Sequence, residues 1–250
     1  MKQGEDDLYF VLNRHTNKTK LIRGNINFVN NHFWNCYESA TTGDIVIEAV
    51  AATDEYLDTY FDRNLARPHP TWSDIFHPPI RCHISFENAT ATCVPMFQQM
   101  KKNIISEDGP ENWNPTTILF DYPTFNPLYK MDSSYQYFYA IGITSNTSGW
   151  FDRVIKVDVR NDTITHAWSL PDLYLTEFDF VPARKEKEGG KEDDGVLFGI
   201  AYNQTKDQSY VVMLNATNLF LLGMYPMEHV VPFHAHGIVC PSGIPCYTNP

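Results

Sequence analysis

Short runs of β-branched and aromatic residues recur along this 250-residue chain, and polar turns separate them. About 14 such runs can be counted, joined mostly by hairpin-type turns. Neighbouring runs that are joined this way pair as antiparallel strands, and helical periodicity is nearly absent. The pattern therefore predicts an all-β fold, with a sandwich, a barrel and a propeller as the candidate architectures. Four strands per blade would make about three and a half propeller blades.

The predicted strands fall into two groups. In the first part of the chain three hairpins are expected, formed by Leu8–Leu12 with Lys20–Arg23, His32–Glu38 with Asp44–Ala51, and Ile80–Phe86 with Thr92–Phe97. A short surface helix is expected from residue 53 to Leu65, between two of these strands. The later strands are expected at Thr117–Asp121, Gln136–Thr144, Phe151–Val159, Ile164–Leu170, Thr176–Val181, Gly195–Tyr202, Tyr210–Leu214 and Leu219–Met224.

Composition excludes several classes of partner. The formal net charge is -11, and no cluster of Lys and Arg exceeds the mixed run Arg184–Lys191, so no nucleic-acid partner is expected. No apolar run approaches the ~20 residues of a membrane span, and the polar start does not resemble a signal peptide. We expect a cytoplasmic protein, and peripheral association with a membrane is compatible with this expectation.

The cysteine and asparagine patterns also indicate the compartment in which the protein resides. The five cysteines are an odd number without a CxxC pair, which argues against a zinc ribbon and against a full disulfide framework, and we expect reduced thiols. Cys240 and Cys246 could pair or bind metal, although a loose tail is the simpler interpretation. Six Asn-x-Ser/Thr sequons would accept glycans if the chain were secreted, and we interpret them as turn chemistry: Asn17, Asn88, Asn146, Asn161, Asn203 and Asn215.

Two histidines near the end of the chain have the spacing of metal ligands. If the segment 231–237 is a strand, His234 and His236 share one face, because side chains alternate in direction. Imidazole binds iron, copper, zinc and nickel, so this spacing alone selects no metal. A second histidine environment lies at His32, inside the aromatic run His32-Phe33-Trp34-Asn35-Cys36-Tyr37-Glu38.

These motifs together resemble the carotenoid cleavage oxygenase family. His32, with Asn three positions later and an acid six later, is similar to one of the family's four iron-binding histidines, and Ala235-His236-Gly237 is similar to another. The run from Phe120 to Asn126 and the stretch from Glu177 to Leu197 resemble two further family segments. The motifs occur in the family's order along nearly the whole chain.

The resemblance implies a seven-bladed β-propeller with iron(II), Fe(2+), on its axis, held by four histidines and reached through a lipophilic tunnel. Residues 1–250 would form a partial domain, about the C-terminal half of the ring. His32 and His236 would be two of the iron ligands. Asp121 and Glu177 match acids that accept the far ring N–H of such ligands, although Asp121 stands where the family generally has Glu and reaches about one methylene less far. A water could bridge that gap, or the contact could be absent.

Other residues allow alternatives. His234 could be a surrogate ligand, a supporting group or a bystander. His15 and the remaining histidines match no family motif, and we expect them to be structural. Glu177, on the strand face opposite Phe178 and Phe180, could instead form a surface salt bridge. Six aromatics could line the tunnel or pack within blades: Phe28, Phe33, Trp34, Tyr122, Phe125 and Phe233.

Two functional hypotheses of different classes follow. The first is iron(II)-dependent oxidative cleavage of a carotenoid or apocarotenoid double bond by dioxygen, giving aldehydes or ketones, with this chain as the C-terminal portion of the enzyme. The second is a noncatalytic propeller fragment that binds a lipophilic ligand or a partner. Retinoid isomerohydrolysis is a third option within the family. Walker, GxGxxG and GxSxG motifs do not occur, which weakens the nucleotide-binding and hydrolase interpretations.

Overall fold

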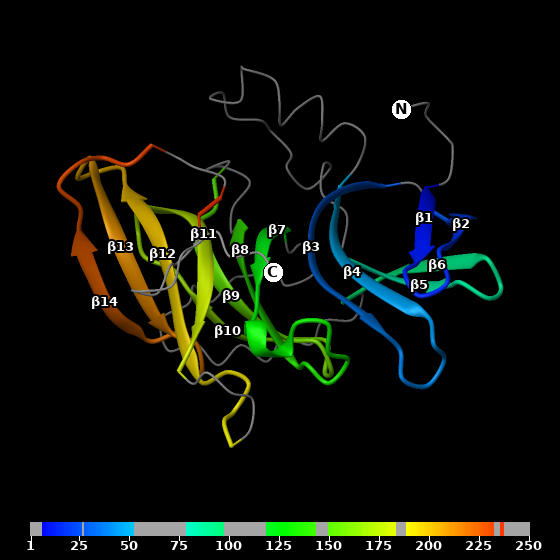
Figure 1. The fold of residues 1–250 in the computed structure, drawn as a ribbon. Coiled ribbons are helices and arrows are strands. Elements are labelled where there is room, and N and C mark those ends of the chain that lie inside the picture. Colours follow the sequence, from blue (N-terminus) through cyan, green and yellow to red (C-terminus); the bar gives the residue numbers. More distant parts are fainter. Residues whose placement is uncertain are drawn as a thin grey trace.

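The computed structural model describes residues 7–26, 28–52, 79–97, 119–143, 150–183, 189–232 and 236–237. These residues form fourteen strands and one short 3-10 helix, Pro127–Tyr129 (η3). The strands lie in four antiparallel sheets, one of two strands and three of four strands (Figure 1). The predicted all-β class is confirmed. Within the described residues, no helix is long and apolar enough to span a membrane.

The first six strands make two sheets. A two-stranded sheet pairs β1 (Leu8–Asn13) with β2 (Lys18–Arg23). A four-stranded sheet follows in the order β3 (Val29–Glu38), β4 (Ile45–Ala52), β5 (Ile80–Ser85) and β6 (Thr90–Pro95). All three hairpins expected from the sequence are present as β1–β2, β3–β4 and β5–β6. The expected helix ending at Leu65 lies outside the described residues.

The other eight strands make two further sheets of the same design. The third sheet has the order β7 (Leu119–Thr124), β8 (Tyr137–Ile143), β9 (Arg153–Asp158) and β10 (Thr163–Trp168). The fourth has the order β11 (Leu173–Pro182), β12 (Gly195–Asn203), β13 (Gln208–Asn215) and β14 (Leu221–Pro226). In each four-stranded sheet the strands are adjacent in sequence order, which is the up-and-down arrangement of a propeller blade.

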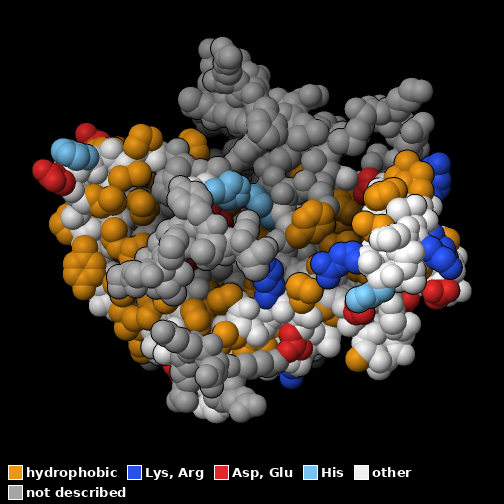
Figure 2. All heavy atoms as spheres, in the orientation of Figure 1, with side chains coloured by type: hydrophobic (Ala, Val, Ile, Leu, Met, Phe, Trp, Pro, Cys, Tyr) orange, Lys and Arg blue, Asp and Glu red, His pale blue; other side chains and the backbone are white. Residues whose placement is uncertain are grey.

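The first strands of the three four-stranded sheets lie next to one another. Strand β3 packs beside β7, and β11 packs beside both β7 and β8, so the three sheets meet along these strands (Figure 1). At the far side of the fourth sheet, β14 carries exposed apolar side chains (Figure 2). Side chains that project from β3, β7 and β11 can therefore converge, although the strands are far apart in the sequence.

Apolar side chains fill the spaces between neighbouring sheets. One cluster, which includes Trp34, Phe138 and Ile155, joins the second and third sheets, and another, which includes Tyr139, Phe178 and Leu197, joins the third and fourth. Gly199 lies opposite Phe178 in the register, and a Cβ there would come within 2.6 Å of the phenyl ring. Glycine at this position therefore leaves room for the Phe178 ring against the backbone of β12.

A buried polar network also connects the second and third sheets. Glu48 is 0% exposed, and its carboxylate accepts a hydrogen bond from Arg81 Nε at 2.7 Å and another from the Tyr135 hydroxyl. The same hydroxyl accepts a hydrogen bond from Trp34 Nε1 at 2.8 Å. Because Trp34 lies two residues from His32 on β3, this network fixes the strand that carries the histidine.

One expectation about the cysteines is wrong. Cys82 and Cys93 face each other across β5 and β6 and form a disulfide with an S–S distance of 1.98 Å. The Tyr9 hydroxyl lies 3.1 Å from Cys93 Sγ and 3.4 Å from Cys82 Sγ. A spacing of eleven residues gave no sign of this pair, because only the β5–β6 register brings the two positions together. Cys36 is free and exposed, and Cys240 and Cys246 lie outside the described residues.

The condition under which His234 and His236 would share one strand face is not met by the described residues around them. Val231, Pro232, His236 and Gly237 belong to no strand. Pro232 lacks the N–H that a ladder needs, which opposes a strand at this point. His234 lies outside the described residues, so its predicted alternatives stay open.

Candidate metal centre

His32 projects from an irregular part of β3. The pairing of β3 with β4 shifts register between Asn30 and His32 and again between Phe33 and Asn35. Bulges of this kind re-aim side chains and are common beside functional sites. The ring is 22% exposed, and its Nδ1 lies 2.6 Å from Oδ1 of Asp121 on β7.

Asp121 reaches His32 directly despite being shorter than glutamate. Its carboxylate is 1% exposed, and Oδ1 also accepts a hydrogen bond from the backbone N–H of Tyr122 at 2.8 Å. The β7–β8 register shifts between Asp121 and Thr124, and Tyr122 has a φ of 52°. The sequence left open a bridging water or a lost contact between these two residues. The direct contact of 2.6 Å replaces both alternatives.

Glu177 makes the equivalent contact with the second histidine. Its Oε2 lies 3.3 Å from Nδ1 of His236 and accepts a hydrogen bond from the backbone N–H of Gly237 at 2.9 Å. Phe178 and Phe180 are buried while Glu177 is partly exposed, as the strand alternation predicted. The β11–β12 register shifts between Leu175 and Phe178, so this acid too lies in a bulge. The sequence did not reveal the role of the Gly237 N–H, because a backbone donor leaves no residue-type signal.

The two imidazoles face each other through their remaining nitrogens. Nε2 of His32 lies 3.4 Å from Nε2 of His236, and the ring centroids are 5.1 Å apart. When each Nδ1–H is donated to a carboxylate, each neutral ring directs its Nε2 lone pair towards the other. Burial lowers the pKa of His32, but the hydrogen bond and the charge of Asp121, together with the charge of Glu177, outweigh it and raise that pKa above its ordinary value. The two carboxylates therefore favour a positive charge at His32.

A divalent transition metal fits this donor pair. Imidazole nitrogens lie roughly 2 Å from a bound metal ion, so two that share one ion lie about 3 to 3.5 Å apart. The facing carboxylates orient the rings and offset the charge of an ion. Two donors are fewer than a protein metal site normally uses, and no group of three or more His, Cys, Asp or Glu side chains suited to a metal is found among the described residues.

Tyr122 packs against both histidines. Its ring centroid lies 4.9 Å from that of His32 and 5.6 Å from that of His236, and Phe151 contacts it edge-on at 5.6 Å. A positive φ is rare for an aromatic residue and persists only where the surrounding structure enforces it. The strained backbone thus places one buried ring beside both imidazoles.

The other candidate residues behave differently. Phe28 and Trp34 are buried in apolar clusters and Phe125 packs against one, as the packing alternative predicts, whereas Phe33 is 57% exposed. Phe233 lies outside the described residues, as do His69 and His77. Among the described histidines, His15, His83, His166 and His229 contribute no contact to the pair.

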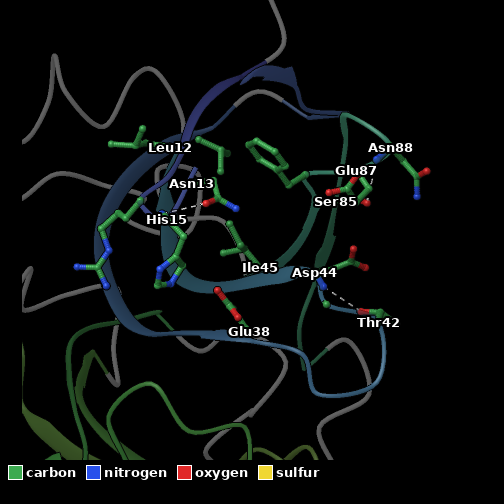
Figure 3. Close-up of a pocket in the computed structure, with 14 residues that line it drawn as sticks. Leu12, Asn13, His15, Glu38, Thr42, Asp44, Ile45, Ser85, Glu87 and Asn88 are labelled. Atoms are coloured by element: carbon green, nitrogen blue, oxygen red, sulfur yellow. Dashed lines mark hydrogen bonds between the residues drawn. The ribbon is translucent and has the colours of Figure 1, made fainter. Parts of the chain in front are cut away.

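A cavity of about 620 Å³ lies elsewhere, at the turn ends of β1–β2, β3–β4 and β5–β6 (Figure 3). Polar side chains that include Asn13, His15, Glu38 and Asp44 line it. None of the four candidate site residues does, so this cavity is separate from the histidine pair.

Comparison with known proteins identifies the family. A family model described as retinal pigment epithelial membrane protein matches residues 1–240. The chain belongs to this family, the carotenoid oxygenases. Among curated relatives, a carotenoid dioxygenase of Neurospora crassa is 28% identical over 125 residues, which are 48% of this chain and 19% of that protein. A torulene dioxygenase of Fusarium fujikuroi is 27% identical over 121 residues, covering 48% of this chain and 20% of that protein.

Solved structures of carotenoid oxygenases share the fold. An apocarotenoid oxygenase variant from Synechocystis matches with a TM-score of 0.71 and 20% identity, covering 94% of this chain and 44% of that one. A cobalt-substituted form of the Synechocystis enzyme also matches with a TM-score of 0.71, at 19% identity and with 94% and 44% coverage. The chain thus spans less than half the length of the solved structures that it resembles.

Proposed function

We propose that this chain is the C-terminal portion of an iron(II)-dependent oxygenase that cleaves a double bond of a carotenoid or apocarotenoid. One C=C bond and one O₂ would give two carbonyl groups, as aldehydes or ketones. The observation that carries the proposal is the facing pair His32 and His236, each held by its own carboxylate. Relatives named carotenoid dioxygenase and torulene dioxygenase support cleavage as the reaction class.

His32 and His236 would hold the metal through Nε2, and Asp121 and Glu177 would keep the ring protons on Nδ1. Iron(II), when bound, would supply a site at which dioxygen is activated. Tyr122 would exclude water from one side of the rings, because its side chain is buried against both. We propose that the remaining donors come from polypeptide outside these 250 residues, and that the four sheets form half of a seven-bladed ring.

A noncatalytic ligand-binding or partner-binding propeller is the second candidate. The observation in its favour is that the described residues supply only two facing imidazoles. Two imidazoles alone bind iron more weakly than four. The two candidates differ in what the longest polypeptide from the natural transcript contains and does, so that polypeptide is the material to test.

The test is cleavage by the full-length protein loaded with ferrous iron under reducing conditions. A panel of carotenoids and apocarotenoids is followed by the loss of polyene absorbance, and the products are identified by mass spectrometry. His236→Ala should abolish cleavage and lower iron content, whereas His229→Ala, at an exposed position outside the pair, should alter neither. Unchanged iron content and cleavage in His236→Ala would exclude the site assignment.

A further inference from the structure

The Asn-x-Ser/Thr sequons divide into two groups in the folded protein. Five of the six lie in described residues, each in or beside a hairpin turn. If these asparagines serve the turns, each sequon should form a hydrogen bond within its turn. The side-chain amide, or the hydroxyl two residues later, should bond to the turn.

Three sequons form such a hydrogen bond. Asn161 Nδ2, the atom that would carry a sugar, donates to Asp158 Oδ2 at 2.8 Å. Asn203 Oδ1 accepts from the backbone N–H of Lys206 at 2.8 Å. Asn215 Oδ1 accepts from the backbone N–H of Thr217 at 2.8 Å. At these positions the asparagine is explained by the turn itself.

The Asn88 side chain forms no such hydrogen bond among the described residues. The side chain is exposed and has no hydrogen-bond partner among the described residues, and Figure 3 shows it projecting away from the cavity beside it. The left-handed position of its turn is taken by Ala89, with a φ of 53°, and the backbone N–H of Asn88 donates to Ser85 Oγ. Nothing in the local fold requires asparagine here.

Asn17 is exposed in the same way at the tip of β1–β2. Its side chain also lacks a hydrogen-bond partner within the described part of the chain. Its φ of 56° does favour asparagine, so the turn explains the residue type but uses neither the amide nor Thr19. Thr19 and Thr90, the hydroxyl residues of the two sequons, are both exposed.

The disulfide supplies an independent observation on the same hairpin. Cys82 and Cys93 are 1% and 2% exposed and join β5 to β6 on either side of the Asn88 turn. Disulfides persist in the oxidising compartments of the secretory route and are rare in the cytosol. The expectation of a cytoplasmic protein rested in part on reduced thiols, and this pair removes that support.

We propose that Asn17 and Asn88 are N-glycosylated and that the protein matures in an oxidising, glycosylating compartment. In the transfer, Nδ2 of asparagine forms a bond to the anomeric carbon of an oligosaccharide donor, the amide loses one proton, and a polyprenyl diphosphate leaves. The two cysteine thiols lose two protons and two electrons to a disulfide of an oxidoreductase, which becomes a dithiol. The inference is independent of the histidine pair and of the proposed oxygenase activity.

The test uses the natural full-length coding sequence expressed in animal cells. Free thiols are alkylated at lysis, and the protein is digested with a peptide N-glycosidase in heavy-oxygen water, which converts glycosylated Asn to labelled Asp. The proposal expects label at 17 and 88, none at 161, 203 or 215, and a Cys82–Cys93 peptide protected from alkylation. Unmodified asparagine at 88, or alkylated Cys82 and Cys93, would overturn it.

Matched variants separate loss of a glycan from loss of folding. Thr90→Ala removes the sequon and leaves Asn88 in place, whereas Thr90→Ser keeps the sequon. The first should increase electrophoretic mobility by one glycan and the second should not. Thr205→Ala, at an exposed position in the Asn203 sequon, should also leave mobility unchanged. Equal mobility of the Thr90→Ala and Thr90→Ser proteins would contradict the assignment of Asn88.

Discussion

Nε2 of His32 and Nε2 of His236 lie 3.4 Å apart although 204 residues separate them in the sequence. His32 is bonded to Asp121 and His236 to Glu177, and these four residues come from β3, β7, β11 and the segment after β14. Each acid therefore fixes one ring, and Asp121 and Glu177 lie on the first strands of neighbouring sheets.

Replacing Glu177 with Gln should weaken metal binding without unfolding the protein. The change keeps side-chain size but removes the charge that faces His236 Nδ1, and loss of such a partner lowers metal affinity by about 10 to 100 fold. Iron affinity and melting temperature should be measured together in the full-length protein. Glu228→Gln, at an exposed position, is the control. A surface salt bridge would instead give unaltered affinity and a stability change well under about 1 kcal/mol.

Tyr122 should position the two rings through its aromatic face. Tyr122→Phe keeps that face and should retain cobalt(II) affinity, whereas Tyr122→Leu should lower it by roughly 10 fold, because both imidazoles lose a packing partner. Titration followed by visible absorbance measures the affinity. Equal affinities for the Phe and Leu variants would show that the ring does not orient the pair.

Tyr135→Phe should destabilise the contact between the second and third sheets. The change removes the donor to the buried Glu48 and the acceptor for Trp34 Nε1, and such losses cost about 1 to 3 kcal/mol. Urea unfolding gives the free energy. Tyr174→Phe is the matched control, because its hydroxyl bonds to Gln204 in solvent and its loss should cost well under about 1 kcal/mol. Equal costs for the two variants would contradict the role of the network.

Because of Tyr9, the free energy of unfolding should fall at alkaline pH. Burial and the charge of Asp7 raise the pKa of its phenol from 10.0 to about 12. Below pH 10 the phenol is neutral in both states, and between these two values the unfolded chain ionises first, so stability falls as pH rises. Tyr9→Phe should show a smaller fall over that interval. Identical pH profiles for the two proteins would contradict the raised pKa.

The sequence predicted the strands well because alternation and turn residues are local signals. The predicted ends of strands were wrong where the backbone is irregular. Strand β7 was expected to end at Asp121, before Pro123, yet it continues to Thr124 through a bulge. The disulfide was missed because the facing of Cys82 and Cys93 depends on strand register, which their spacing does not encode.

The candidate site was predicted in its residues but not in its geometry. Family motifs selected His32, Asp121, Glu177 and His236, and the structure brings all four together, while their metal role stays a prediction. The sequence left open whether His236 shares a strand face with His234, and the structure shows His236 outside any strand. Its position depends instead on the Gly237 N–H bonded to Glu177, a long-range contact that no sequence pattern marks.

Iron affinity in a double-mutant cycle tests most directly whether His32 and His236 hold one metal ion. The full-length protein, His32→Ala, His236→Ala and the double variant are titrated with ferrous iron in the absence of oxygen. Ligands of a single ion act as a unit, so each single change should remove most of the affinity and the double change should cost little more than either one. Losses that add as independent effects, or undiminished affinity in His236→Ala, would contradict the shared centre.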